Sequence, residues 1–276
     1  MKGQAVRILM IGDIVGKPGR RIIREGLSSI RDQHAVDLVI ANAENAADGS
    51  GLMPNHYKQL IDAGVDCITM GDHVYRRREI YDTLESSDNI IKPANYPSDS
   101  PGRGSTTVTA PNGQQVGVIN LQGRVFMKPV DCPFQAVERE LASMPAAVRV
   151  IVVDFHAEAT SDMQTMGRYL DGRVSAVLGT HTHVPTADEE IFPGGTAFQC
   201  DVGMTGPHES ILGRRIDRVT ESVTTFRPVA FAVAAGDVRL HGTIVEINPT
   251  DGKATSVERL VVRRAEVDQW LSEGSS

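Results

Sequence analysis

Residues 8–20 read ILMIGDIVGKPGR, an apolar run that stops at Gly12-Asp13 and is followed by a glycine-containing turn. A phosphate-binding Walker loop requires Gly-x-x-x-x-Gly-Lys-Ser/Thr, in which the lysine contacts phosphate and the hydroxyl contacts magnesium. Here Gly12 and Gly16 are one residue too close, and Pro18 stands where the hydroxyl residue is needed. The stretch therefore predicts a β-strand that ends near Asp13, whose carboxylate is a candidate metal ligand.

Other apolar runs alternate with amphipathic segments over the first two thirds of the chain. They predict strands at Val6–Ile11, Leu38–Ala41, Cys67–Met70, Gly117–Leu121, Val148–Val153 and Ala176–Leu178. Several runs are continuous in Val, Ile and Leu, as is typical of parallel strands covered on both faces. Pro18 and Pro54 stand at the expected starts of two helices. This pattern predicts an α/β fold.

The last third of the chain, from Thr196 onward, has the alternating pattern of antiparallel strands. The predicted hairpins join Asp237–Ile247 to Ser256–Arg264 through NPTDG at 248–252, and Thr106–Thr109 to Gln115–Leu121 around Pro111-Asn-Gly113. No repeat, low-complexity tract or change in composition marks a linker. We therefore predict a single domain over residues 1–276, with a frayed tail from about residue 268.

Composition and charge exclude several classes of protein. The formal charge of −7 over 276 residues argues against stable binding to nucleic acid. The cysteines Cys67, Cys132 and Cys200 are odd in number and form no Cys-x-x-Cys motif, which fits a reducing compartment. The N-terminal apolar stretch is interrupted by Arg7 and resembles neither a signal peptide nor a membrane span. A cytoplasmic protein without membrane contact is expected.

Polar residues follow five of the apolar strands, where each strand ends. These residues are Asp13, Glu44-Asn45, Asp72-His73, His156, and the pair His181 and His183. In open parallel sheets, ligands collect beyond the carboxyl ends of the strands. A set of carboxylate, amide and imidazole groups without thiolates suits Mn, Fe, Zn or Ni rather than a structural zinc site. The pattern thus predicts a metal centre.

Each of these positions also has a simpler explanation. An Asp after a strand is commonly a turn residue or helix cap, which applies to Asp13 and Asp72. Glu44-Asn45 can belong to an ordinary surface loop, and His156 can be a hydrogen-bonded core imidazole. His181 and His183 are harder to dismiss, because alternate residues of a strand point to the same side. Together the five strand ends favour the metal centre.

Eight sequence blocks, in this order, closely resemble one known family. The blocks are GDIVGKPGR, ANAENAADGSG, GDH, PANYP, PGRG, VDFHAEATS, MGRYLDGRVSAVLGTHTHVPTAD and DVGMTGP. They resemble the YmdB-type branch of the calcineurin-like metallophosphoesterases, bacterial phosphodiesterases associated with cyclic nucleotides. The likeness runs from about Arg7 to the last predicted hairpin. The resemblance implies a four-layer α/β/β/α sandwich of two mixed sheets flanked by helices.

The resemblance also implies a dinuclear metal centre and its ligands. One metal would be surrounded by Asp13, Glu44, Asn45 and His183, and the other by Glu44, Asp72, His156 and His181. His73 would be the catalytic histidine beside the phosphate. The two metals, Fe or Mn with Zn and Mg as alternatives, would hold a bridging hydroxide that attacks phosphorus. Asp154 and Glu158 are candidates to orient His156.

The expected substrates are small cyclic nucleotides, either 2′,3′ or 3′,5′, and the expected reaction is phosphodiester hydrolysis. A phosphomonoesterase or nucleotidase with the same centre is the alternative enzyme, and a regulatory protein that retains a metal site is the alternative outside the enzymes. Arg103 and Arg124 are candidate phosphate contacts, because arginine suits bidentate contacts to phosphate oxygens. Tyr96 and Phe126 are candidate stacking faces or core residues. Homo-oligomerisation is compatible with the family.

One position departs from the pattern of the superfamily, in which an Asn-His pair stands where this chain has Asp72-His73. Two divalent ions carry +4, and three carboxylates with a bridging hydroxide carry −4, so the centre would be neutral instead of +1. A neutral centre attracts a phosphate anion less strongly. We therefore expect Asp72 to favour a metal pair with a trivalent ion such as iron, or to lower activity with two divalent ions.

Overall fold

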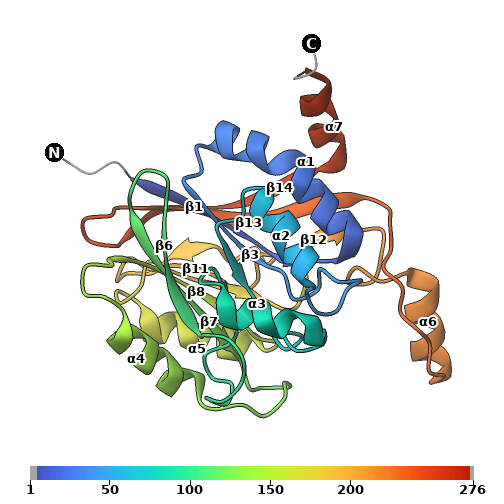
Figure 1. Cartoon of the computed structure of the whole chain (residues 1–276), viewed down its shortest axis with the longest axis horizontal. Coiled ribbons are helices and arrows are strands. Elements are labelled where there is room, and N and C mark those ends of the chain that lie inside the picture. The colour runs from blue at the N-terminus through green and yellow to red at the C-terminus, as the bar shows by residue number, and fades with distance from the viewer. Residues whose placement is uncertain (1–4, 274–276) are drawn as a thin grey trace.

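Two β-sheets packed face to face, with helices on the outer side of each, form the computed structural model, which describes residues 5–273 (Figure 1). The first sheet contains β1 (Val6–Ile11), β2 (Asp13–Ile14), β3 (Leu38–Asn42), β4 (Cys67–Thr69), β5 (Ile90–Ile91), β12 (Met204–Pro207), β13 (Val238–Ile247) and β14 (Ala254–Arg263). The second contains β6 (Ser105–Thr109), β7 (Gln115–Gln122), β8 (Val150–His156), β9 (Ala176–Thr180), β10 (Glu190–Ile191) and β11 (Ala197–Gln199). The predicted four-layer α/β/β/α sandwich is confirmed.

The helices are divided between the two outer faces. They are α1 (Gly16–His34), α2 (Pro54–Asp62), α3 (Tyr81–Ser86), α4 (Pro133–Ser143), α5 (Thr160–Leu170), α6 (Ile216–Thr225) and α7 (Arg264–Glu273), with a 3-10 turn η1 (Arg78–Ile80). Buried residues of α1, α2, α3 and α7 pack on the first sheet, and those of α4 and α5 pack on the second. Helix α6 buries none of its residues and projects from the body (Figure 1). Within residues 5–273, no helix combines the length and the apolar composition that crossing a membrane requires.

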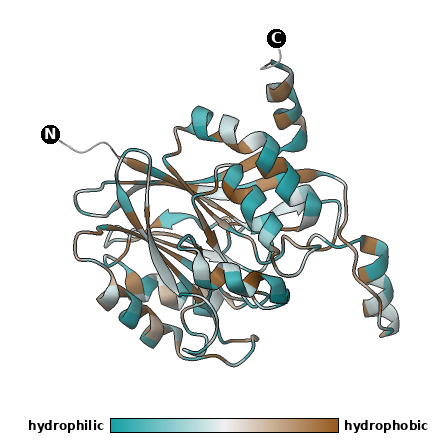
Figure 2. Cartoon of the chain, viewed as in Figure 1, coloured by the Kyte–Doolittle hydropathy of each residue, from teal (hydrophilic) through white to brown (hydrophobic). Residues whose placement is uncertain are grey.

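The central strands bury both of their faces, which explains their continuous apolar sequences. In β3, Leu38 and Ile40 belong to the core between the two sheets, whereas Val39 and Ala41 face the helices of the first outer layer. Apolar residues accordingly run along the central strands, while the helices have polar outer faces (Figure 2). Because alternate residues of a strand point to opposite faces, a strand between two cores cannot show polar alternation.

Parallel pairing brings the carboxyl ends of the central strands to one edge of each sheet. In the first sheet β1, β3, β4 and β5 are parallel neighbours in that order. In the second sheet the parallel order is β7, β8, β9 and β11. The loops that follow β3, β4, β8 and β9 can therefore lie close together beyond the sheets, as the predicted site requires.

Both predicted hairpins are confirmed, but the C-terminal third is not purely antiparallel. Strands β13 and β14 pair antiparallel, as do β6 and β7. However, β11 is parallel to β9, and α6 and α7 are helical. The predicted frayed tail is wrong for residues 268–273, because α7 continues to Glu273. Two contacts anchor α7 to α1: Val267 packs against Gly26, and Arg264 pairs with Glu25. The remaining part of the predicted tail, residues 274–276, lies outside the described residues.

Candidate metal centre

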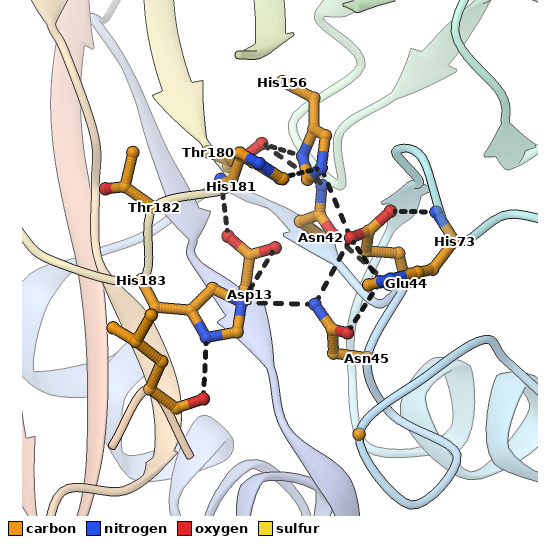
Figure 3. Close-up of polar contacts among 12 residues, drawn as sticks. Asp13, Asn42, Glu44, Asn45, His73, His156, Thr180, His181, Thr182 and His183 are labelled. Atoms are coloured by element: carbon orange, nitrogen blue, oxygen red, sulfur yellow. Dashed lines mark hydrogen bonds and ion pairs between the residues drawn. The ribbon is translucent and has the colours of Figure 1, made fainter. Parts of the chain in front are cut away.

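Strand ends and loops from both sheets bring all eight of the predicted metal and catalytic residues together. Figure 3 labels each of them except Asp72. Asp13 belongs to β2, and Glu44 and His73 follow β3 and β4 of the same sheet. His156 is the last residue of β8 in the second sheet. Asp13 lies between His181 and His183, and its Oδ2 accepts a hydrogen bond from the backbone N–H of His181 at 3.0 Å.

One half of the cluster has the arrangement of a metal site. Ligand atoms of Glu44, Asp72, His156 and His181 all lie within 4.8 Å of one another. The Nε2 atom of His156 is 3.3 Å from Oε1 of Glu44 and 3.4 Å from Oδ1 of Asp72. That Asp72 oxygen is buried and has no hydrogen-bond donor. A buried carboxylate oxygen without a donor is costly, and a cation at this point would satisfy it.

The other half of the cluster joins the first through Glu44. Oδ1 of Asp13 is 3.7 Å from Nε2 of His183, is buried, and also has no hydrogen-bond donor. The side-chain amide of Asn45 lies 3.2 Å from Nε2 of His183 and 3.3 Å from Oε1 of Glu44. Two groups of oxygen and nitrogen ligands thus share one carboxylate. The donor set and the two unsatisfied oxygens fit cations in both halves.

Protons compete with a metal for this cluster. Burial opposes the ionisation of Glu44, but the charges and hydrogen bonds of His156 and His73 outweigh it and hold the pKa of Glu44 well below its ordinary value. Burial opposes the charged form of His156 as well, and the facing carboxylates Glu44 and Asp72 nonetheless raise its pKa well above its ordinary value. The carboxylate of Glu44 is therefore ionised, and a metal that binds His156 has to displace a proton from its ring.

A buried hydrogen-bond chain fixes which ring nitrogen of His156 faces the cluster. The hydroxyl of Thr180 donates to Oδ1 of Asp154 at 2.7 Å and lies 2.9 Å from Nδ1 of His156. Because the Thr180 hydroxyl donates its hydrogen to the carboxylate, it can only accept a hydrogen bond from the ring. Nδ1 of His156 therefore carries a proton, and Nε2 is the nitrogen available to a metal. Burial raises the pKa of Asp154 to about 6.

These hydrogen bonds refine the sequence prediction of which residues orient His156. Asp154 acts on His156 through Thr180 rather than by direct contact. Glu158 does not contact His156; its Oε2 lies 3.0 Å from Nε2 of His181. Asn42, which the sequence analysis did not select, donates to Oδ2 of Asp154 at 3.2 Å and to Thr180 at 3.3 Å.

The His-Thr-His segment lies in a strained turn and not in a strand, contrary to the sequence prediction. Strand β9 ends at Thr180, and the φ angles of His181 and His183 are +112° and +65°. Such values are unfavourable for side chains with a Cβ, and they persist only where the surroundings enforce them. Asp201 supplies this support, because its Oδ2 accepts both the N–H and the hydroxyl of Thr182 at 2.8 Å. The two imidazoles converge because of this turn.

Gly71 lies where β4 gives way to the cluster, and its lack of a side chain is required there. A Cβ at this position would overlap the ring of His156 and Oε2 of Glu44. Even an alanine would therefore displace two ligands, or the loop that carries Asp72 and His73 would have to move. The GDH block thus needs glycine at its first position because a side chain there would overlap His156 and Glu44.

His73 is in contact with the cluster and is also partly open to solvent. Its backbone N–H donates to Oε2 of Glu44 at 2.8 Å, and its Nδ1 lies 3.0 Å from Oδ1 of Asn45. Burial lowers the pKa of His73, but the hydrogen bond and charge of Glu44 and the charge of Asp72 outweigh it, so that the pKa is raised. With 26% of its side chain exposed, His73 lines a depression of about 290 Å³ beside the cluster.

The two predicted arginines lie elsewhere, and a third arginine lines this depression. Arg103 pairs with Asp88 at 2.6 Å on the surface, and Arg124 is exposed; neither lines a depression next to the cluster. Arg214 does, and its guanidinium donates to the carbonyl oxygens of Asp48, Gly49 and Phe231. It forms no ion pair with any residue in the range 5–273. No local motif marks Arg214, which explains why the sequence analysis missed it.

Comparisons with known proteins show which proteins this chain resembles. The sequence model of a family described as "YmdB-like protein" matches residues 9–260. A 2′,3′-cyclic-nucleotide 2′-phosphodiesterase of Bacillus subtilis (strain 168) is 45% identical over 257 residues, which cover 93% of this chain and 97% of the relative. Crystal structures of a hypothetical protein from Thermus thermophilus and of a novel phosphatase from Mycoplasma pneumoniae both superpose with a TM-score of 0.88, at 41% and 30% identity. These superpositions cover 94% of this chain, and 99% and 94% of the two solved chains. On this evidence the chain belongs to the family of YmdB-like proteins.

Proposed function

We propose that this protein is a dinuclear metal-dependent phosphodiesterase that hydrolyses small cyclic nucleotides, either 2′,3′ or 3′,5′. The observation that carries the proposal is the pair of ligand groups that share Glu44, with His73 beside them and open to solvent. The name of the Bacillus subtilis relative, a 2′,3′-cyclic-nucleotide 2′-phosphodiesterase, supports the same reaction.

We assign the predicted ligands to two cation sites. One cation would be held by Asp13, Glu44, Asn45 and His183, and the other by Glu44, Asp72, His156 and His181. Such a pair of metal ions supplies Lewis acidity, which lowers the pKa of a bound water and offsets the charge of the phosphate. In the hydrolysis, a bond forms between phosphorus and the oxygen of water, and the bond from phosphorus to the leaving ribose oxygen breaks.

His73 is placed to handle the proton of this exchange. A protonated imidazole at this position can donate to the leaving oxygen as the P–O bond breaks. Glu44 and Asn45 hold the ring by contacts of 3.0 Å to its Nδ1, which leaves Nε2 as the donor. His73 thereby has the position of a general acid.

Arg214 is the residue to which we assign the phosphate contact that was expected of Arg103 and Arg124. It lines the same depression as His73, and its guanidinium is held in place by backbone carbonyls. A preorganised cation next to the reacting phosphate stabilises the charge that develops in the transition state. Truncation of Arg214 should lower kcat/KM by about 100-fold, the usual magnitude for one such donor.

Iron and manganese are the proposed metals, because the ligands are carboxylate, amide and imidazole groups without thiolates. The cysteines Cys67, Cys132 and Cys200 are unpaired, which fits the proposed cytoplasmic location. Asp72→Asn should raise the positive charge of the centre by one and increase the activity with two divalent ions. Unchanged rates and unchanged metal preference would remove the proposed role of the Asp72 charge.

The test begins with the metal content of protein purified without added metal. Turnover of 2′,3′-cyclic AMP, 3′,5′-cyclic AMP, bis(p-nitrophenyl) phosphate and p-nitrophenyl phosphate is then compared for the wild type, His73→Ala and Glu44→Gln. The proposal expects metal-dependent turnover of the diesters, with losses of at least ~100-fold in both variants while the circular dichroism stays unchanged. Faster turnover of the monoester would favour a phosphomonoesterase, and metal binding without any turnover would favour a regulatory protein.

A further inference from the structure

A second depression borders the cluster on the side of Asp72. It has a volume of about 320 Å³, which is at the lower end of the range for small-molecule sites, about 300–1,000 Å³. The residues that line it are Asp72, Tyr75, Arg76, Tyr96, Pro97, Lys128, Pro129 and Val130. Since Asp72 belongs to the cluster and also lines this depression, a molecule bound at the cluster can extend directly into it.

Two cations line this depression and have no partner of their own. Arg76 and Lys128 are both exposed, and within the described range 5–273 neither side chain forms an ion pair or a hydrogen bond. Other cations nearby are engaged: Arg77 donates to the carbonyl oxygen of Ser50, and Arg103 pairs with Asp88. Two unpaired cations in one depression of a chain with a net charge of −7 mark a local site for an anion.

Two tyrosine rings form the apolar part of the same depression. The ring centroids of Tyr75 and Tyr96 lie 6.0 Å apart. Both hydroxyls are directed into the protein, where Tyr75 donates to the carbonyl oxygen of Pro101 at 2.6 Å and Tyr96 donates to Oε1 of Gln122 at 2.8 Å. The rings are thus fixed in orientation, and what they offer to a ligand is aromatic surface, which suits a flat group such as a nucleobase.

We infer that this depression binds the remainder of a nucleotide that carries a second phosphate group, with the nucleoside against Tyr96 and Tyr75 and the second phosphate on Arg76 and Lys128. The inference deepens the proposed function, on which it rests, because that function places the scissile phosphate at the cluster. A cyclic mononucleotide has no other phosphate and leaves both cations unpaired. A 2′,3′-cyclic nucleotide with a 5′-phosphate, as at the 3′ end of a short oligonucleotide, satisfies them.

Binding of product-like nucleotides tests this inference without turnover. Isothermal titration calorimetry compares adenosine 3′,5′-bisphosphate with 3′-AMP in manganese-loaded protein at about 150 mM salt, where exposed charges are screened as they are under physiological conditions. The wild type should bind the bisphosphate about tenfold more tightly, which corresponds to one charge-assisted contact. The double variant Arg76→Ala/Lys128→Ala should bind the two ligands with affinities within a factor of two. Arg78→Ala removes an exposed cation from the same segment, outside the depression, and should keep the tenfold preference.

Turnover supplies a second, independent readout. The ratio of kcat/KM for 5′-phosphorylated 2′,3′-cyclic AMP to that for 2′,3′-cyclic AMP should be about ten in the wild type and in Arg78→Ala, and near one in the double variant. Equal affinities for the two ligands in the wild type, or a preference that survives in the double variant, would overturn the inference. Protein that binds the bisphosphate preferentially but hydrolyses neither substrate would contradict the proposed function and leave the binding site supported.

Discussion

The substitution Thr180→Val removes one hydroxyl from the buried chain that orients His156. Valine has nearly the shape of threonine, and Thr180 is fully buried, so the change leaves the packing intact. It deprives Nδ1 of His156 and Oδ1 of Asp154 of their partner at 2.9 and 2.7 Å. Asp154 retains a hydrogen bond from Asn42 to its other oxygen, but the imidazole N–H retains no partner at a comparable distance.

The magnitude follows from these two losses. A buried polar group left without its partner costs about 1–3 kcal/mol, so the free energy of unfolding of Thr180→Val without metal should fall by about 2–3 kcal/mol. Loss of the group that orients a ligating histidine typically weakens metal binding by about 10–100-fold. We expect manganese affinity, measured by competition with a chelating dye, to fall within this range. Urea unfolding at pH 7 measures the stability of the same samples.

Thr243→Val is the matched control. Thr243 is also a fully buried strand residue whose hydroxyl donates to a side chain, Oε1 of Gln199, but it lies outside the cluster. Its substitution should cost about 1–2 kcal/mol of stability and leave the manganese affinity unchanged. If Thr180→Val binds manganese as tightly as the wild type, or if both variants lose the same affinity, the assigned role of Thr180 is refuted.

Three further substitutions test other parts of the structure. Gly71→Ala should abolish metal binding while the protein remains folded, because its Cβ would overlap the ring of His156; equilibrium dialysis that finds bound manganese would contradict this. Burial lowers the pKa of His241 to about 4, so this residue alone should account for a loss of about 3 kcal/mol of stability as the pH falls from 6.5 to 4, because the unfolded state takes up the proton first. His241→Leu, which removes two buried ring nitrogens without partners, should flatten this part of the stability profile in urea unfolding. Burial raises the pKa of Glu25, but the hydrogen bonds from Arg264, Arg24 and Arg21 together outweigh it and lower that pKa to about 2. Glu25→Gln should therefore cost about 1 kcal/mol at pH 7, and a difference from the wild type that persists as the pH falls from 4.5 to 2 would argue against this pair.

The sequence predicts the strands and the residues at their ends because both depend on local order along the chain. The runs that lead to Asp13 and to His156 are apolar except for Arg7 and Asp154, as expected of strands buried on both faces, and polar residues gather where each strand ends. Parallel pairing then brings these ends together without any information from the loops. For this reason residues as distant in sequence as Asp13 and His183 could be assigned to one cluster before the structure was known.

Other features depend on tertiary contacts that leave no local pattern. The turn at His181 and His183 depends on Asp201, which follows a different strand, and a His-x-His pattern alone is equally compatible with an extended strand. Arg214 enters the depression from an irregular segment that no periodicity describes. The C-terminal helix was taken for a frayed tail because its stability comes from contacts with α1 rather than from its own sequence.

The order in which the chain is synthesised differs from the order of strands in the first sheet. Val6 of β1 pairs with Ile247 of β13, and Asp13 of β2 pairs with Met204 of β12. A nascent chain on the ribosome therefore exposes β1 without its antiparallel neighbour until almost all of the protein has been translated. An incomplete translation product that ends before β12 contains all of the predicted ligands but lacks the strand that pairs with Asp13.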